Sequence, residues 1–258
     1  MLKGKKGIIF GIANDHSIAW GIAKKLHNHG AELCITYQNE IFLKRVKPLA
    51  EELNCKIMIE CDFSNKNSIK NCFENIEKKW HKIDFVVHAV AFSEKEELNG
   101  RYIDTSKNNF INSLNISCYS FTQIAKLSSN LMSDGGSLLT LTFYGANKVM
   151  PNYNVMGVAK AALETSVKYL STDLGSKKIR VNAISAGPMR TLAGAAIANA
   201  REVYKYTEKN SPLKRNVLLE EIGNTALYLI SDHSNAVTGE IHNVDCGFNI
   251  IGMPKNNF

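Results

Sequence analysis

The sequence KGIIFGIANDHSIAWG occupies residues 6–21 and contains a short apolar run, a glycine, a polar loop and the start of a helical pattern. The run at residues 6–10 predicts a buried strand, Gly11 follows it directly, and Ser17 stands where a helix N-cap is expected. This order is typical of a phosphate-binding turn, because backbone N–H groups and the helix dipole favour a pyrophosphate there. The usual G-x-G-x-x-G spacing is absent, so a simple strand-to-helix turn also explains the stretch taken alone.

The same alternation of strand and helix continues along the whole chain. Short runs rich in β-branched residues predict strands at residues 6–10, 32–37, 56–61, 83–89, 137–143, 180–185 and 240–244. Helical patterns predict helices at residues 17–29, 41–53, 66–80, 107–131, 152–174 and 220–231. The alternation predicts an α/β fold, a single-domain, Rossmann-like, doubly wound sheet of about seven parallel strands with helices on both faces. Ligands of such sheets bind at the carboxyl ends of the strands, so the residues after each strand form the candidate site.

Composition limits the classes of protein that this chain can represent. Its 258 residues are 45% hydrophobic and 21% charged, which suits one globular domain with a substantial core. No apolar run approaches the roughly 20 residues of a membrane helix, so no membrane association is expected. The formal net charge is +7, but acidic residues separate the lysines, and nucleic acid is not an expected partner. The six cysteines show no C-x-x-C and no paired histidines, which argues against a metal and for a reducing cytoplasm.

A second informative stretch, PNYNVMGVAK at residues 151–160, places Tyr153 and Lys160 seven residues apart. Seven residues make nearly two helical turns, so the phenol and the ammonium would project from the same face of a helix. A tyrosine can donate a hydrogen bond or a proton to a developing oxyanion, and a nearby lysine can favour the phenolate or hold a cofactor hydroxyl. A surface Tyr and Lys on an amphipathic helix would show the same spacing, so the pair alone does not decide between the two.

Residues after the second, third and fourth predicted strands supply candidate cofactor contacts. Gln38 can hydrogen-bond the ribose hydroxyls of an adenosine but cannot neutralise a 2′-phosphate, which favours NADH over NADPH. Asp62 fits an adenine contact as an acceptor, and a helix-capping role is an equal alternative. Residues 89–91 would lie against the cofactor, although a plain packed turn explains that segment equally well.

Together these segments resemble the short-chain dehydrogenase/reductase superfamily, and more specifically the bacterial type I enoyl-[acyl-carrier-protein] reductases, over essentially the whole chain. The stretches that carry the resemblance are GIANDHSIA at residues 11–19, YQN at 37–39, PNYNVMG at 151–157, RVNAISAGP at 180–188 and RTLA at 190–193. The NYNVMG run with a lysine seven residues after its tyrosine is the most specific of them.

The spacing separates this chain from an ordinary short-chain dehydrogenase. Those enzymes place the tyrosine four residues before the lysine, and a serine some thirteen residues before that tyrosine. Counting back from Lys160, Met156 and Phe143 occupy those positions here. Neither side chain can do acid–base chemistry, which disfavours an ordinary carbonyl reductase such as a β-ketoacyl reductase.

The resemblance implies NADH-dependent reduction of a trans-2-enoyl thioester on acyl carrier protein, the last step of the type II fatty acid elongation cycle. It assigns catalysis to Tyr153, as donor to the thioester oxygen, and to Lys160, as support for Tyr153 and for the nicotinamide ribose. The implied contacts to NADH or NAD are Gly11, Ile12, Ser17, Ile18, Gln38, Asp62, Phe63, Ala89, Val90, Ala91, Lys160, Ala186, Pro188, Met189, Thr191, Leu192 and Ala193. The implied substrate contacts are Ser93, Phe143, Tyr153, Met156, Ala193 and Ile197.

The resemblance also implies a substrate-binding flap at about residues 190–210, for which an ordinary alanine-rich helix is the alternative. Arg201, Lys205 and Lys209 share one helical face there and form a docking surface suited to an acidic carrier protein. Glu202 interrupts this patch, and a solvated helix face explains the pattern equally well. In relatives the last segment, residues 241–248, packs at a subunit contact, and the usual assembly is a homotetramer.

Two positions depart from the commoner pattern of the family. Phe143 stands where many relatives carry a second active-site tyrosine, and Tyr144 follows it; some relatives have phenylalanine at this point, so activity is expected. Ala91 replaces a glycine common near the nicotinamide, and its methyl group is expected to narrow the pocket beside the ring. A catalytically silent NAD(H)-binding sensor or scaffold is the alternative from a different class, and the Phe143 change is the only hint of it.

Overall fold

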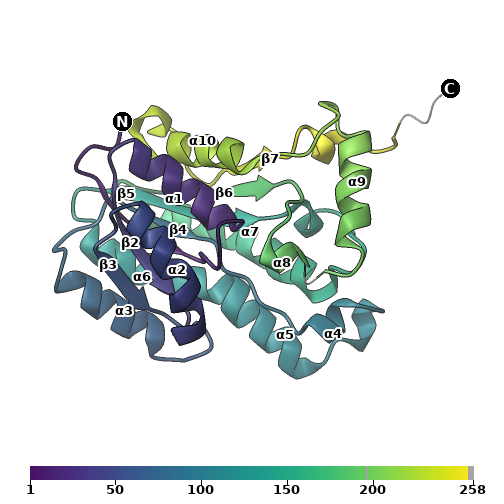
Figure 1. Cartoon of the computed structure of the whole chain (residues 1–258), viewed down its shortest axis with the longest axis horizontal. Coiled ribbons are helices and arrows are strands. Elements are labelled where there is room, and N and C mark those ends of the chain that lie inside the picture. The colour runs from purple at the N-terminus through teal and green to yellow at the C-terminus, as the bar shows by residue number, and fades with distance from the viewer. Residues whose placement is uncertain (196, 255–258) are drawn as a thin grey trace.

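The computed structural model describes residues 1–195 and 197–254, with one sheet of seven strands at its centre (Figure 1). The strand order is β3-β2-β1-β4-β5-β6-β7, and every neighbouring pair is parallel. The bounds are β1 (Lys6–Phe10), β2 (Glu32–Tyr37), β3 (Ile57–Glu60), β4 (Phe85–His88), β5 (Gly136–Thr142), β6 (Ile179–Ala186) and β7 (Ile241–Val244). The predicted α/β fold with its parallel sheet is confirmed.

Helices cover both faces of the sheet, and each face has its own apolar core. The first core contains residues from α1 (Ile18–Asn28), α2 (Glu40–Glu52) and α10 (Leu219–Ile230). The second contains residues from α3 (Ser68–Glu77), α6 (Ser120–Leu131) and α7 (Asn154–Gly175). Helices on both sides explain why β4 is buried along its whole length and contains a continuous apolar run.

The remaining segments lie beyond the carboxyl ends of the strands, where they can shape a ligand site (Figure 1). They include the helices α4 (Lys95–Leu98), α5 (Lys107–Leu114), α8 (Leu192–Ala195) and α9 (Ala200–Asn210). Elsewhere in the described residues, short 3₁₀ turns are formed by η1 (Tyr102–Asp104), η3 (Tyr144–Ala146), η4 (Asp232–Ser234) and η5 (Phe248–Ile250).

The direction of the chain across the sheet reverses at β1, which pairs with β2 on one side and β4 on the other. Phe10 lies opposite His88 in this register, so Gly11 and Ala89 follow neighbouring strand ends. Gly11 has φ +100°, and a Cβ added to it would overlap the carbonyl oxygen of Ala89. Only glycine therefore suits this position, which lies where the strand order reverses and where such sheets bind their ligands.

The bounds of the predicted helices differ slightly from the structure, for example at residues 66–80, where α3 spans Ser68–Glu77. One predicted helix is also divided. The pattern at residues 107–131 predicts one continuous helix, but a π-helical turn, η2 (Asn115–Tyr119), separates α5 from α6. In this turn Ser117 Oγ accepts a hydrogen bond from Phe92 N–H at 3.0 Å and so ties the helix to the segment after β4. One extra residue in a helical turn barely changes the apolar pattern, which is why the sequence did not reveal it. The helix predicted from residue 152 begins at Asn154.

Two further questions about the described residues, 1–195 and 197–254, are whether they contain a membrane-spanning helix or a metal-binding group of side chains. No helix in this part of the chain has both the length and the apolar character needed to cross a membrane. In the same residues, no group of three or more His, Cys, Asp or Glu side chains is arranged to hold a metal ion.

Candidate active site

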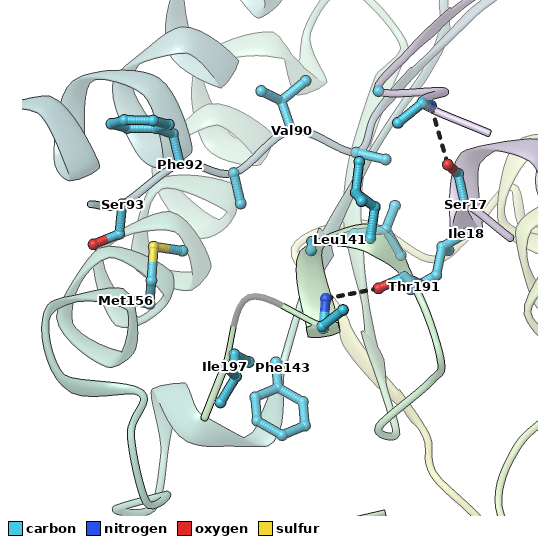
Figure 2. A pocket seen from close by; sticks show the side chains of 18 of the residues that line it. Ser17, Ile18, Val90, Phe92, Ser93, Leu141, Phe143, Met156, Thr191 and Ile197 are labelled. Atoms are coloured by element: carbon cyan, nitrogen blue, oxygen red, sulfur yellow. Dashed lines mark hydrogen bonds between the residues drawn. The ribbon is translucent and has the colours of Figure 1, made fainter. Parts of the chain in front are cut away.

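A cleft of about 1500 Å³ opens at the carboxyl ends of the strands, beside α8 and α9 (Figure 2). Every residue that the sequence analysis assigned to cofactor or substrate lines this single cleft, from Gly11 after β1 to Ile197 after α8. The structure adds lining residues that the sequence did not indicate: Leu98, Asn115, Ile116, Leu141, Met150 and Tyr204. They come from α4, β5, α9, the π-helical turn and the loop before α7, and tertiary packing brings them to the cleft.

The glycine turn after β1 is held by Ser17 (Figure 2). Ser17 Oγ accepts hydrogen bonds from the N–H groups of Ala13 (3.0 Å) and Asn14 (3.1 Å), and donates to Asn14 Oδ1 (3.2 Å). Ser17 occupies the N-cap position of α1, as predicted. Its side chain, however, makes no capping hydrogen bond to the helix. The hydroxyl fixes the shape of the loop instead, and Ile18 and Ala19 of the first helical turn line the cleft.

Gln38 and Asp62 meet at the end of the cleft formed after β2 and β3. Gln38 Nε2 donates to Asp62 Oδ1 at 3.3 Å, and the same oxygen accepts from Ser64 N–H (3.0 Å) and Ser64 Oγ–H (2.8 Å). The N-cap position of α3 is Asn67, so the alternative of Asp62 as its cap was wrong. A carboxylate beside Gln38 makes this end of the cleft unfavourable for a further negative charge.

Tyr153 occupies the N-cap position of α7 and is buried. Burial raises the pKa of its phenol, and the negative charge of the Glu164 carboxylate raises this pKa further. The phenol therefore stays protonated at neutral pH. A protonated phenol in a cleft is a hydrogen-bond donor for an oxygen that gains negative charge.

Lys160 lies on α7 and is also buried. Its Nζ donates to the carbonyl oxygen of Leu141 at 2.8 Å, which holds the ammonium at the carboxyl end of β5. Burial lowers the pKa of Lys160 to about 8, against the opposing influence of Cys118 and Glu164. An ammonium has three N–H donors, so two remain for a ligand beyond the bond to Leu141.

His88 ends β4 behind the cleft and is fully buried. Its Nε2 lies 2.8 Å from Ser120 Oγ, and its Nδ1 lies 2.8 Å from Thr140 Oγ1. In a neutral imidazole one of these nitrogens donates and the other accepts. Burial and, to a smaller extent, the charge of Lys160 lower the pKa of His88 to about 3. This neutral histidine therefore links β4 to β5 and to the start of α6.

An apolar pocket forms the part of the cleft next to Tyr153. Leu98 and Met156 are buried in it, and Phe143, Met150 and Ile197 pack against them. Figure 2 shows Met156 near Ser93 at one side and Phe143 near Ile197 at the other. These surroundings suit a hydrocarbon chain and disfavour a charged substituent.

The structure shows whether Tyr144 can replace the second active-site tyrosine that many relatives carry at the position of Phe143. The ring of Phe143 packs edge-on against Tyr153, with centroids 5.1 Å apart and an interplanar angle of 70°. The ring of Tyr144 packs against Phe248 at 5.7 Å, and Tyr144 is not among the described residues that line the cleft. The tyrosine next in sequence does not, therefore, take the place of a second active-site tyrosine.

The segment predicted as a flap forms α8 and α9, with Asn199 between them in the left-handed region at φ 59°. Thr191 Oγ1 accepts from Gly194 N–H at 2.9 Å and stabilises the start of α8 (Figure 2). The guanidinium of Arg190 lies 4.8 Å from the ring centroid of Tyr204, which links the segment before α8 to α9. Arg201, Lys205 and Lys209 are exposed on α9.

Comparisons with known proteins identify the family. The family model described as "Enoyl-(Acyl carrier protein) reductase" matches residues 11–249. The chain belongs to this family. It is 58% identical to "Enoyl-[acyl-carrier-protein] reductase [NADH] 2" of Rhizobium meliloti (strain 1021) over 254 residues, covering 98% of this chain and 95% of the relative. It is 57% identical to the NADH-dependent enoyl-[acyl-carrier-protein] reductase of Rickettsia typhi over 255 residues, covering 99% and 98%.

Solved structures of enoyl-[acyl-carrier-protein] reductases share this fold. The enzyme of Anaplasma phagocytophilum, crystallised in complex with NAD, superposes with a TM-score of 0.95 at 55% sequence identity, covering 99% of this chain and 97% of that one. The resemblance first indicated by the NYNVMG run is confirmed. The segments that carried the resemblance differ in their role. Residues 11–13, 17–19 and 190–193 line the cleft. Arg180 and Asn182 do not line it and instead bind backbone carbonyls of other segments.

Proposed function

We propose that this enoyl-[acyl-carrier-protein] reductase uses NADH to reduce trans-2-enoyl-[acyl carrier protein] to the saturated acyl form, the last step of type II fatty acid elongation. The observation that carries the proposal is the joint placement of Tyr153 and Lys160. Both are buried and line one cleft together with the glycine turn at Gly11 and an apolar pocket. A donor, a cation, a dinucleotide turn and an acyl-sized pocket are the parts that this reaction needs.

The residues of the cleft fit a nicotinamide dinucleotide. The glycine turn before α1 lines the cleft at a helix N-terminus, where backbone N–H groups and the helix dipole favour a pyrophosphate, and Gln38 offers an amide for the adenosine ribose. Asp62 beside Gln38 disfavours the extra phosphate of NADPH, which supports a preference for NADH. When bound, NADH supplies a hydride to the β-carbon of the enoyl thioester.

The chemistry assigned to the chain's own residues follows from their environment. As the β-carbon is reduced, negative charge develops on the thioester oxygen, and the protonated phenol of Tyr153 donates a hydrogen bond to it. Protonation of the α-carbon then completes the saturated acyl chain. The ammonium of Lys160 stabilises that charge electrostatically, and its remaining N–H groups hold the ribose hydroxyls. The apolar pocket around Met156 and Phe143 orients the acyl chain and excludes water.

The partners follow from the same proposal. Residues 190–210, including α8 and α9, act as the flap over the acyl chain, and the exposed cations Arg201, Lys205 and Lys209 receive the acidic carrier protein. The working form is a homotetramer in the cytoplasm, with residues 241–248 at a subunit contact. Metal ions and nucleic acid have no part in this proposal.

The test is NADH consumption by the purified protein with a trans-2-enoyl thioester and, separately, with a β-ketoacyl thioester. Oxidation with the enoyl substrate alone would support the proposal. Oxidation with only the ketoacyl substrate would overturn it in favour of carbonyl reduction. No NADH oxidation with either substrate, despite measurable NADH binding, would favour a non-catalytic sensor or scaffold.

The rate is expected to fall as the pH rises through about 8, the pKa that burial gives to Lys160. The ammonium is charged below this pH and neutral above it, so the form that stabilises the thioester oxygen is lost on the alkaline side. The pH profile of kcat/KM measures this in the free enzyme. In Lys160→Arg this fall of kcat/KM at alkaline pH, the alkaline limb of the profile, should vanish, because a guanidinium stays charged throughout this range. A limb that persists in the arginine variant would assign it to another group.

A further inference from the structure

Glu164 is a buried carboxylate on α7 that the proposed chemistry does not use. Its Oε1 accepts a hydrogen bond from Thr142 Oγ1 at 2.8 Å, and its Oε2 accepts from Asn147 Nδ2 at 3.0 Å. Thr142 is the last residue of β5, and Asn147 directly follows the turn η3. One carboxylate on the helix thus holds both ends of residues 143–146, the stretch that follows β5.

Two of the four residues between these anchors, Phe143 and Gly145, contact the ring of Tyr153. Phe143 packs edge-on against that ring at a centroid distance of 5.1 Å. Gly145 lies beneath it, and a Cβ added at Gly145 would overlap Tyr153 Cδ1. Any movement of this turn would therefore move the tyrosine ring or open a gap beside it.

The helix contributes a second close approach at the same place. A Cβ added at Gly157 would lie 2.8 Å from the carbonyl oxygen of Gly145, so a glycine is required for α7 to lie this close to the turn. Gly157 belongs to the first turns of α7, and Glu164 lies farther along the same helix. The turn is thus held against α7 by backbone packing at one point and by the carboxylate at another.

We propose that Glu164 is a positioning residue for Tyr153, because it holds residues 143–146 against α7 and so keeps the phenol directed at the substrate oxygen. This inference rests on the proposed function, in which Tyr153 is the donor. Glu164 does not itself line the cleft among the described residues, so it acts only through the turn and through its charge.

The charge of Glu164 gives a second, separable effect. The charged or titratable groups that influence Tyr153 and Lys160 are Glu164 on α7, Cys118 on the π-helical turn and the neutral His88 on β4. The carboxylate raises the pKa of both Tyr153 and Lys160. Replacing it by a neutral group lowers both, so the alkaline limb of the pH profile should move to lower pH.

The experiment compares Glu164→Ala, which removes both hydrogen bonds, with Glu164→Gln, which can keep them. A glutamine accepts from Thr142 through its oxygen and donates to Asn147 once the asparagine amide is turned over. We expect Glu164→Ala to lower kcat by roughly 10- to 100-fold, the loss typical of a small misplacement, with NADH affinity nearly unchanged. We expect Glu164→Gln to stay within about threefold of the wild-type kcat, since its hydrogen bonds are restored, with its alkaline limb at lower pH.

Three further variants separate positioning from a general loss of stability. Asp173→Asn removes an exposed acid from the same helix and should leave kcat, NADH affinity and pH profile unchanged. Arg180→Ala destabilises the fold far from the cleft and should keep kcat. Asn147→Ala removes one of the two anchors at an exposed site, and it takes the place of Glu164→Ala if that variant does not fold.

Crystal structures of Glu164→Ala and Asn147→Ala give a readout that does not require turnover. The ring of Tyr153 should leave its contact with Gly145, whether or not the wild-type protein reduces an enoyl thioester. An unmoved ring, or a kcat that falls no more than in Arg180→Ala, would overturn the inference. A wild-type protein that is inactive on the enoyl thioester would overturn the proposed function instead, and the crystal structures would still decide the role of Glu164 in placing the ring.

Discussion

Replacing Tyr153 with phenylalanine is expected to lower kcat for the trans-2-enoyl thioester by a factor on the order of 10²–10³, the usual loss when one oxyanion donor is removed. NADH affinity should stay close to that of the wild type, because the ring keeps its packing against Phe143 and its seat over Gly145. Steady-state NADH oxidation measures the first quantity, and quenching or enhancement of NADH fluorescence on binding measures the second.

The neighbouring tyrosine offers a matched control for this experiment. Tyr144→Phe removes a hydroxyl from the same segment, but its ring packs on Phe248 and not in the cleft, so kcat should be unchanged. A large loss in Tyr144→Phe would mean that this residue replaces the second active-site tyrosine after all. A Tyr153→Phe enzyme with full activity would remove Tyr153 from the mechanism and leave the non-catalytic alternatives open.

Replacing Arg180 with alanine is expected to lower the free energy of unfolding by about 3 kcal/mol, since several charge-assisted hydrogen bonds disappear and buried carbonyls lose their donor. Arg180 Nη1 donates to the Leu229 carbonyl (2.7 Å) and Ser234 Oγ (2.9 Å). Its Nη2 donates to the carbonyls of Ile230 (3.3 Å) and Ser231 (3.1 Å). These carbonyls stand at the end of α10, where a helix has no partners of its own and favours a positive charge.

The measurement is denaturant unfolding, or thermal unfolding with an expected decrease in Tm of about 6–12 °C for a domain of this size. Arg180→Lys should lose less, because an ammonium keeps the positive charge at the helix end but cannot reach all of these acceptors. Lys177→Ala, an exposed change nearby, should stay within about 0.5 kcal/mol of the wild type. A loss below about 1 kcal/mol in Arg180→Ala would show that water replaces the guanidinium at these carbonyls.

This result bears on how the sequence motif RVNAISAGP should be understood. The motif indicated the family, yet its first polar residues perform no chemistry in the cleft. Arg180 holds the end of α10, and Asn182 donates to the Val237 carbonyl (2.9 Å) and accepts from Glu240 N–H (3.1 Å). Only its last part, Ala186 to Pro188, reaches the cleft. A sequence stretch typical of an enzyme family can therefore report a fold as much as a reaction.

The sequence by itself determined the fold class and the membership of the site. Alternating strand and helix patterns require a parallel sheet, and the carboxyl ends of parallel strands meet at one edge. The residues that follow those strands must therefore come together, which is why each predicted cofactor and substrate residue lines the same cleft. Family resemblance supplied the segment after β6 and the substrate contacts at Ser93, Phe143 and Met156, for which no local pattern exists.

Only the tertiary structure decided how these residues are held. The use of the Ser17 hydroxyl by its own loop, the place of Tyr144 outside the cleft and the bond from Lys160 to Leu141 are all invisible in local periodicity. The same is true of Glu164, whose partners lie 22 and 17 residues away along the chain. Such contacts arise when separate elements pack, and a packed interior accepts a polar side chain only where the neighbouring element presents the matching donor or acceptor.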